Sequence, residues 1–140
     1  MNTEATLKGN LLHDITHWGI SASIGITFIV HSLKKFDPGW QEWLVSIGIP
    51  PELQLPIALA EFLGGILLVV GVLTRIAGAI LGVILLGAIF HIRWENGFFV
   101  SNGGWEWDLV MLAGVLAIIA AGPGRVSISH AVKKVPRFLQ

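Results

Sequence analysis

The chain has 140 residues, of which 54% are hydrophobic and 13% are charged, and its mean hydropathy is +0.74. This length suits one domain, but the composition is too apolar for a soluble protein, so the sequence predicts a single membrane domain over residues 1–140 in the lipid bilayer of the cell membrane. Nine basic residues balance nine acidic ones and cysteine is absent. The balanced charge gives no overall attraction to nucleic acid. The absence of cysteine excludes disulfides, thiolate metal sites and a cysteine nucleophile.

The first apolar segment covers residues 15–33 and contains no acid or base except histidine. At 1.5 Å per residue, a helix of this length is about 28 Å long, which matches the hydrocarbon core of a bilayer. Ser23, Thr27 and His31 recur every four residues, and Ser21 and Gly25 form a neighbouring small pair, so we expect one polar, closely packing stripe to face the other helices. The polar residues 1–10 lack the layout of a signal peptide, and we expect none to be cleaved.

The middle of the chain predicts a short interfacial helix followed by a helical hairpin. Residues 38–47 follow a turn and mix aromatic and apolar residues with polar ones, and two prolines end the segment. Two apolar spans come next, over residues 56–73 and 76–92, with a tight turn at residues 74–75 between them.

The fourth span is the shortest. Its apolar part, from Asp108 to Ala121, has 14 residues, so it must include tryptophans at the membrane interface, and we place it over residues 105–121. The basic tail over residues 122–140 is expected to lie on the cytoplasmic surface of the membrane. Together these segments predict an all-α fold, an integral membrane four-helix bundle.

Basic residues are divided unequally between the two ends of this predicted bundle. Six lie on the side of the termini and three on the other side: Lys8, Arg75, Arg125, Lys133, Lys134 and Arg137 against Lys34, Lys35 and Arg93. Because basic loops stay in the cytoplasm, this imbalance predicts a multi-pass protein with both termini cytoplasmic.

Glu61 is the first candidate for a functional residue, because it lies within an apolar helix. A carboxylate at the centre of a membrane helix costs roughly 2.5–3.5 kcal/mol on insertion scales, so such residues face a protein interior, a partner or water. Glu61 can serve as the catalytic proton acceptor, or as the hydrogen-bond acceptor for a bound polar headgroup. The alternative is an acid that a lysine or histidine neutralises, or that burial keeps protonated, and that only fixes helix packing.

His31, His91 and Trp105 fall at the same predicted outer end as Glu61. With Glu61 they are candidates to line an outer-leaflet pocket for a quinone or quinol, in which the histidines bind the headgroup. The two histidines and Glu61 could instead hold a metal, but none of them has the local His-x-x-x-His spacing of a strong site, so we assign no metal ligand. Lys34 and Lys35 can attract an anionic substrate or reach lipid phosphates.

Four local motifs resemble those of the DoxX family of small four-helix membrane proteins. They are His31-Ser32-Leu33-Lys34-Lys35-Phe36, Gly48-Ile49-Pro50, Glu61-Phe62-Leu63-Gly64-Gly65 with its continuation to Thr74-Arg75-Ile76-Ala77, and Gly122-Pro123-Gly124-Arg125. Two positions depart from the family pattern: Ser32 replaces a typical glycine, and Ser129 replaces a frequent acid. The resemblance implies a four-helix bundle and an association with quinone-linked respiratory systems, such as a terminal quinol oxidase or a thiosulfate:quinone oxidoreductase.

The hypothesis that follows is an accessory membrane subunit of a redox system, with quinone or quinol as its cofactor. Because no haem or iron–sulfur motif is present, electrons would pass to a partner chain. The alternative is a non-catalytic assembly or scaffold subunit that packs against a larger complex through small residues, or against a second copy of itself. Solute transport is disfavoured, because four short spans leave little room for a gated pathway. The sequence does not decide whether the protein is an enzyme.

Overall fold

The computed structural model describes residues 10–124, 126–132 and 136, and every regular element in this part of the chain is helical. The α-helices are α1 (Leu11–Lys35), α2 (Gly39–Ser46), α3 (Gln54–Val70), α4 (Thr74–Gly87), α5 (Glu106–Ala121) and α6 (Ile128–Val132). A π-helical segment, Ala88–Arg93, extends α4, and single 3₁₀ turns occupy Pro51–Leu53, Trp94–Asn96 and Val100–Asn102. The predicted all-α class is confirmed, and each of the four segments predicted to span the membrane contains a helix.

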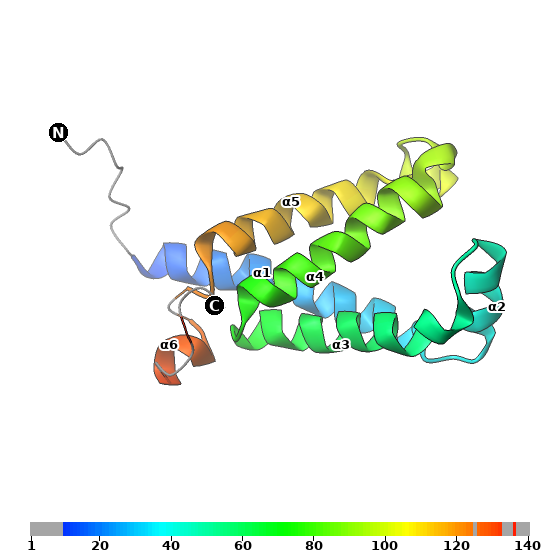
Figure 1. Ribbon diagram of the computed structural model, residues 1–140. Coiled ribbons are helices and arrows are strands. Elements are labelled where there is room, and N and C mark those ends of the chain that lie inside the picture. The colour runs from blue at the N-terminus through cyan, green and yellow to red at the C-terminus, as the bar shows by residue number, and fades with distance from the viewer. Residues whose placement is uncertain (1–9, 125, 133–135, 137–140) are drawn as a thin grey trace.

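The four long helices pack in two pairs. Helix α1 contacts α3 along most of its length, α4 contacts α5, and further contacts join α3 to α4 and α1 to α5. The two pairs meet at the end where α3 turns into α4 and diverge toward the end that carries α2 (Figure 1). The polar connections after α1 and after α4 both lie at this end, each on its own helix pair (Figure 1).

The core lies where the two pairs meet. It consists of aliphatic and aromatic residues from all four long helices: Ile24, Phe28, Leu68, Ala77, Leu81, Leu85, Val115 and Ile118. The buried residues of α3 are Ala58, Glu61, Gly64, Gly65 and Leu68. Their spacing of three or four residues defines one face of a helix, and Glu61 lies on that face.

Glycines allow α1 and α3 to approach until their backbones touch. A Cβ atom at Gly25 would lie 2.5 Å from the carbonyl oxygen of Gly65, and a Cβ atom at Gly65 would lie 2.6 Å from that of Gly25. No side chain fits at either position without moving a helix. The close contact therefore fixes the rotation of α1 and α3 relative to each other.

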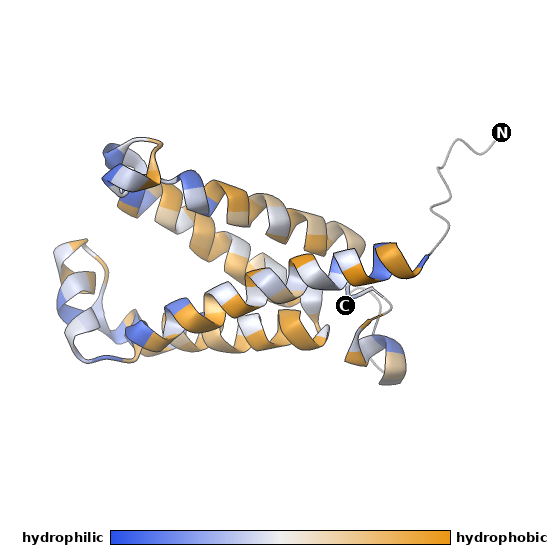
Figure 2. Cartoon of the chain, turned by 180° about the vertical axis from the view of Figure 1, so that it is seen from behind, coloured by the Kyte–Doolittle hydropathy of each residue, from blue (hydrophilic) through white to orange (hydrophobic). Residues whose placement is uncertain are grey.

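The exterior of the long helices is apolar. Large hydrophobic residues such as Ile26, Val30, Leu63 and Val83 are exposed, and polar residues concentrate in α2 and in the connection between α4 and α5 (Figure 2). A soluble protein rarely exposes so many large apolar side chains, whereas a bilayer requires them.

Two helical stretches are long and apolar enough to cross a membrane, Pro51–Val70 and Thr74–Asn96. Only 28% and 33% of the residues in their 18-residue apolar segments are buried, whereas the core helix of a soluble protein is mostly buried. Helix α5 has only 16 residues, and α1 carries serine, threonine and histidine along its length. Four membrane crossings therefore stay a prediction.

The expectation that Ser23, Thr27 and His31 face the other helices is wrong. Ser23 and His31 are exposed, and the hydroxyl of Thr27 donates a hydrogen bond of 2.8 Å to the carbonyl of Ser23 within α1. The small pair Ser21 and Gly25, which was also expected to face inward, is buried, and this part of the prediction is confirmed. Because Gly25 permits the closest approach of α3, that side of α1 turns inward and the polar stripe turns away.

The predicted turn at residues 74–75 is also displaced. Helix α3 ends at Val70, Gly71 adopts a left-handed conformation with φ of 70°, and α4 already begins at Thr74. Glycine reaches this conformation without the steric cost that a Cβ atom imposes, so the helix ends there. Thr74 and Arg75 are consequently the first two residues of α4.

Candidate functional site

Glu61 is buried in the middle of α3 and bonded to the last residue of α1. Its side chain is 3% exposed, and the Lys35 ammonium donates a hydrogen bond to Oε1 and forms an ion pair with it. The second carboxylate oxygen, Oε2, is also buried and has no hydrogen-bond partner among the described residues. Glu61 is therefore held by one oxygen and retains one free acceptor.

Contacts between α1 and α3 hold Lys35 in place. The side-chain amide of Gln54, at the start of α3, donates to the carbonyl of Lys35 at 2.9 Å and to that of Asp37 at 2.7 Å. The Lys35 ammonium also lies 5.2 Å from the ring centroid of Trp40, within the range of a cation–π interaction. These contacts aim the ammonium at Glu61 rather than at solvent, and the Lys35 side chain is only 20% exposed.

A second carboxylate, Asp108 near the start of α5, is buried close to this pair. The Arg93 Nε atom lies 3.4 Å from Asp108 Oδ2, but the two atoms are not aligned for a hydrogen bond. His31 and Lys35 also contribute to the electrostatic field at the Asp108 carboxylate. Acids and bases from α1, α3, α5 and the π-helical segment therefore gather at the end of the molecule where the helix pairs diverge.

The π-helical segment Ala88–Arg93 directs the side chains that follow α4. A π-helical turn holds more residues than an α-helical turn, so it rotates the later side chains relative to the helix before it. Arg93 is thereby placed beside α5, and His91 Nε2 lies 2.8 Å from the carbonyl oxygen of Ile47, just after α2. His91 therefore links the end of α4 to the end of α2.

The four predicted site residues do not form one contact cluster. His31 is exposed on α1, His91 is exposed and bonded to Ile47, and Trp105 is half-buried beside the start of α5. None of the three hydrogen-bonds to Glu61, whose bonded partner in the described chain is Lys35.

Trp105 belongs to an aromatic stack at the end of the α4–α5 pair. Its ring is parallel to that of Trp94, with centroids 5.7 Å apart, and meets the edge of Phe98 at 4.9 Å. Phe90 stacks on the far side of Trp94 at 5.2 Å. This cluster joins the end of α4 to the start of α5.

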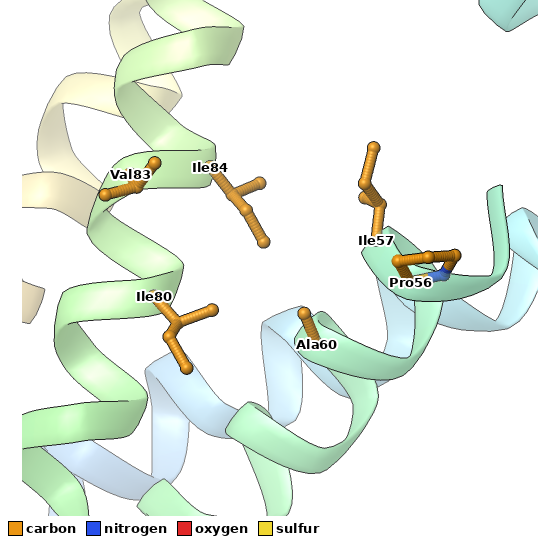
Figure 3. A pocket seen from close by; sticks show the side chains of 6 residues that line it. All are labelled: Pro56, Ile57, Ala60, Ile80, Val83 and Ile84. Carbon is orange, nitrogen blue, oxygen red and sulfur yellow. The ribbon is translucent and has the colours of Figure 1, made fainter. Parts of the chain in front are cut away.

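An apolar pocket of about 300 Å³ lies between α3 and α4 (Figure 3). It is lined by Pro56, Ile57, Ala60, Ile80, Val83 and Ile84. Figure 3 shows these side chains around the space between the two helices. None of the predicted site residues lines it, although Ala60 directly precedes Glu61. The pocket can hold a hydrocarbon chain, and its lining offers nothing to a polar headgroup.

Within the described residues, no three histidine or carboxylate side chains are placed to hold a metal ion. Glu61 is bonded to Lys35, His91 is bonded to Ile47, and His31 is exposed on α1. The structure thus gives no support to the alternative of a site with two histidines and one carboxylate.

The sequence allowed a lysine counter-ion for Glu61 as an alternative but did not indicate which lysine, and it assigned Lys35 to substrate anions or lipid phosphates. The cost of an unpaired carboxylate in an apolar helix favours a base as its counter-ion, but it does not select Lys35 from the bases of the chain. The sequence also indicated no role for Asp108, which marks the start of the apolar part of the fourth span. No local spacing relates Asp108 to Arg93, because the contact crosses from one helix to another.

Residues 22–94 of the chain match the DoxX family, a stretch that includes Lys35 and Glu61 and ends before Trp105. A Bacillus subtilis protein named "Putative oxidoreductase CatD" is 37% identical over 90 residues, 63% of this chain and 65% of that protein. An uncharacterised Haemophilus influenzae protein is 30% identical over 77% of both chains.

The "Uncharacterized membrane protein Rv3486" of Mycobacterium tuberculosis is also 30% identical, over 79% of this chain and 77% of that protein. No solved structure matches the chain. The family match covers the residues that form the Lys35–Glu61 pair. The similarity to the Haemophilus influenzae and Mycobacterium tuberculosis proteins extends over most of the sequence. The chain is therefore a membrane protein that belongs to the DoxX family.

Proposed function

We propose that this protein is a multi-pass membrane subunit of a quinone-linked redox system and that it binds the headgroup of a quinone or quinol beside Glu61. The observation that carries the proposal is the free Oε2 atom of Glu61, a buried acceptor without a donor. A buried carboxylate oxygen without a hydrogen bond costs about 1–3 kcal/mol or more. A quinol hydroxyl that donates to Oε2 removes this cost.

The two oxygens of Glu61 have different tasks in this proposal. Lys35 donates its hydrogen bond to Oε1, while Oε2 accepts the hydrogen bond of the quinol hydroxyl and then its proton. Oxidation of a bound quinol releases protons together with electrons. The electrons pass to a redox partner chain in the membrane, which makes this protein an accessory subunit.

The apolar surroundings suit the rest of such a molecule. The pocket between α3 and α4 takes part of the isoprenoid tail, and its α3 wall ends one residue before Glu61. Stacked aromatic rings around Trp105 offer a flat surface near the polar groups. The similarity to a protein named an oxidoreductase supports the redox class.

The topology proposed with this function has four spans and cytoplasmic termini. Six basic residues on the side of the termini against three on the other side support this orientation. The Glu61 end then faces the outer leaflet. A reporter that is active only in the cytoplasm, fused after Gln140, gives a signal if the orientation is right and stays silent if it is inverted.

The test begins with the protein purified from its native membrane in mild detergent. Extraction and mass spectrometry measure bound quinone per chain and identify co-purifying polypeptides. We expect quinone in the wild type, and we expect Glu61→Gln to lose at least about tenfold in quinone occupancy, because an amide cannot take the proton and is a weaker acceptor. Glu95→Gln, which changes an exposed acid in the loop after α4, is the matched control. If both variants retain the wild-type amount of quinone, or if the wild type carries none, the proposal fails.

The pairing of Lys35 with Glu61 also favours a second candidate, the non-catalytic scaffold. In that case the carboxylate is only the counter-ion that joins α1 to α3, and small residues such as Gly25 and Gly65 mediate assembly. Glu61→Gln would then reduce the amount of assembled complex in proportion to its loss of stability. Loss of quinone with the complex intact supports the redox subunit and contradicts the scaffold.

A further inference from the structure

Three polar side-chain atoms are buried without partners at the other end of α3, away from Glu61. They are Thr74 Oγ1, Arg75 Nε and Ser129 Oγ. Thr74 is 0% exposed and Ser129 is 2% exposed. Each can donate a hydrogen bond, and the described residues offer none of them an acceptor. Arg75 also makes no ion pair with a carboxylate of the described chain.

The three residues are gathered around the turn between α3 and α4. Thr74 and Arg75 are the first two residues of α4. Ser129 lies in α6, and its N–H donates to the carbonyl of Gly71, in the turn itself, at 3.4 Å. The segment that carries α6 therefore packs over the turn and brings Ser129 to the start of α4.

The start of α4 adds backbone donors to the same place. Leu73 occupies the N-cap position and has no side-chain oxygen to accept a hydrogen bond. The N–H of Ala77 donates to the carbonyl of Leu73 at 2.9 Å, but the N–H groups of Thr74, Arg75 and Ile76 donate to no described residue. The α4 helix has 14 residues, so its dipole makes this end partly positive.

We propose that this end of α4 binds a phosphate group. The donors are a guanidinium nitrogen, two hydroxyls and free backbone N–H groups, and this set suits an anion with several acceptor oxygens. A phosphate meets this requirement, and its negative charge is stabilised by both Arg75 and the helix dipole. The phosphate belongs either to the headgroup of a phospholipid or to inorganic phosphate, since both present the same oxygens.

Thermal unfolding of the full-length protein in detergent micelles tests this site, with the tryptophans as the fluorescent probe. Three additives are compared: phosphatidylglycerol, inorganic phosphate, and a glucosyl diacylglycerol that has no phosphate. We expect phosphatidylglycerol or phosphate to raise the Tm of the wild type by about 4 °C or more, and the glucosyl lipid to leave it unchanged. Stabilisation by phosphatidylglycerol alone identifies a lipid headgroup, and stabilisation by inorganic phosphate identifies the free anion.

The variants Arg75→Gln, Thr74→Val and Ser129→Ala each remove one donor. Arg75→Gln is expected to weaken binding of the effective additive about tenfold or more, and the other two by less. Thr74→Val keeps the shape of the side chain, so it reports on the site even if Arg75→Gln does not fold. Thr16→Val, which removes an exposed hydroxyl from α1, is the control and should retain the full Tm rise.

Two results overturn the proposal. One is the absence of any Tm rise with phosphatidylglycerol and with inorganic phosphate. The other is a Tm rise that persists at its full size in Thr74→Val and in every folded variant of Arg75 and Ser129. The experiment does not involve quinone or Glu61, so its outcome is independent of the proposed redox function.

Discussion

Glu61 on α3 and Asp108 on α5 are both buried near Lys35, yet their basic partners hold them differently. Glu61 is 2% exposed and accepts a hydrogen bond from Lys35, whose own contacts to α3 and α2 keep it directed inward. Asp108 is 9% exposed and has Arg93 at 3.4 Å without hydrogen-bond alignment, and the Arg93 side chain is 35% exposed. The two carboxylates therefore differ although both lie near Lys35. Lys35 and Glu61 form a locked pair, in which a hydrogen bond fixes the geometry, whereas Arg93 and Asp108 are close in space without such a bond.

The largest effect is expected from Lys35→Met, which leaves Glu61 buried without its counter-ion. Loss of one partner of a buried ion pair costs about 3–5 kcal/mol, and because Lys35 is partly exposed we expect a value near 3 kcal/mol. Equilibrium unfolding in mixed micelles with a denaturing detergent measures it. The double variant Lys35→Met with Glu61→Gln should recover at least half of the loss, and Lys34→Met, at an exposed position, should change nothing. A cost for Lys35→Met no greater than that of Lys34→Met would contradict the locked pair.

Gly25→Ala tests whether the contact between α1 and α3 sets the geometry of the locked pair. The new Cβ atom would lie 2.5 Å from the Gly65 carbonyl oxygen, so the helices must separate, at an expected cost of about 1–3 kcal/mol. Gly19→Ala is the matched control, because no atom lies within 4 Å of its added Cβ atom. Since alanine favours a helix over glycine, the control should be neutral or stabilising by up to about 1 kcal/mol. Equal behaviour of the two variants in the same unfolding assay would show that the close contact is not needed.

Arg93→Gln tests the weaker of the two ion pairs, in which Arg93 faces Asp108. The pair with Asp108 is partly exposed and poorly aligned, so we expect a loss of about 1 kcal/mol in the free energy of unfolding. Asp108→Asn in the same background should add little, because the pair is already broken. A loss as large as that of Lys35→Met would mean that Asp108 is as firmly paired as Glu61.

The smallest effect is expected at His91, whose hydrogen bond to Ile47 is exposed. His91→Leu should cost about 0.5–1 kcal/mol, whereas His91→Gln, whose amide nitrogen takes the place of Nε2, should retain most of the stability. Quinone content measured on the same samples tests the second role predicted for His91. If quinone is lost in both variants while stability is unchanged, His91 serves the headgroup rather than the link to α2.

The sequence by itself determined the helical class, the approximate position of every long helix and the burial of Glu61. These features depend on local composition, because apolar runs, prolines and glycines act on the segment in which they occur. The sequence also carried the resemblance to the DoxX family, which the match over residues 22–94 confirms. It did not determine which side of α1 faces inward, and the stripe of Ser23, Thr27 and His31 was consequently assigned to the wrong face.

Only the tertiary structure decided which groups meet. Lys35 is 26 residues from Glu61 in sequence, and their contact depends on the approach of two backbones at Gly25 and Gly65. The packing of α6 over the turn after α3 likewise decides that Ser129 lies beside the uncapped start of α4. Such pairings arise from the rotation and separation of whole helices, which many distant contacts set together and no local pattern encodes.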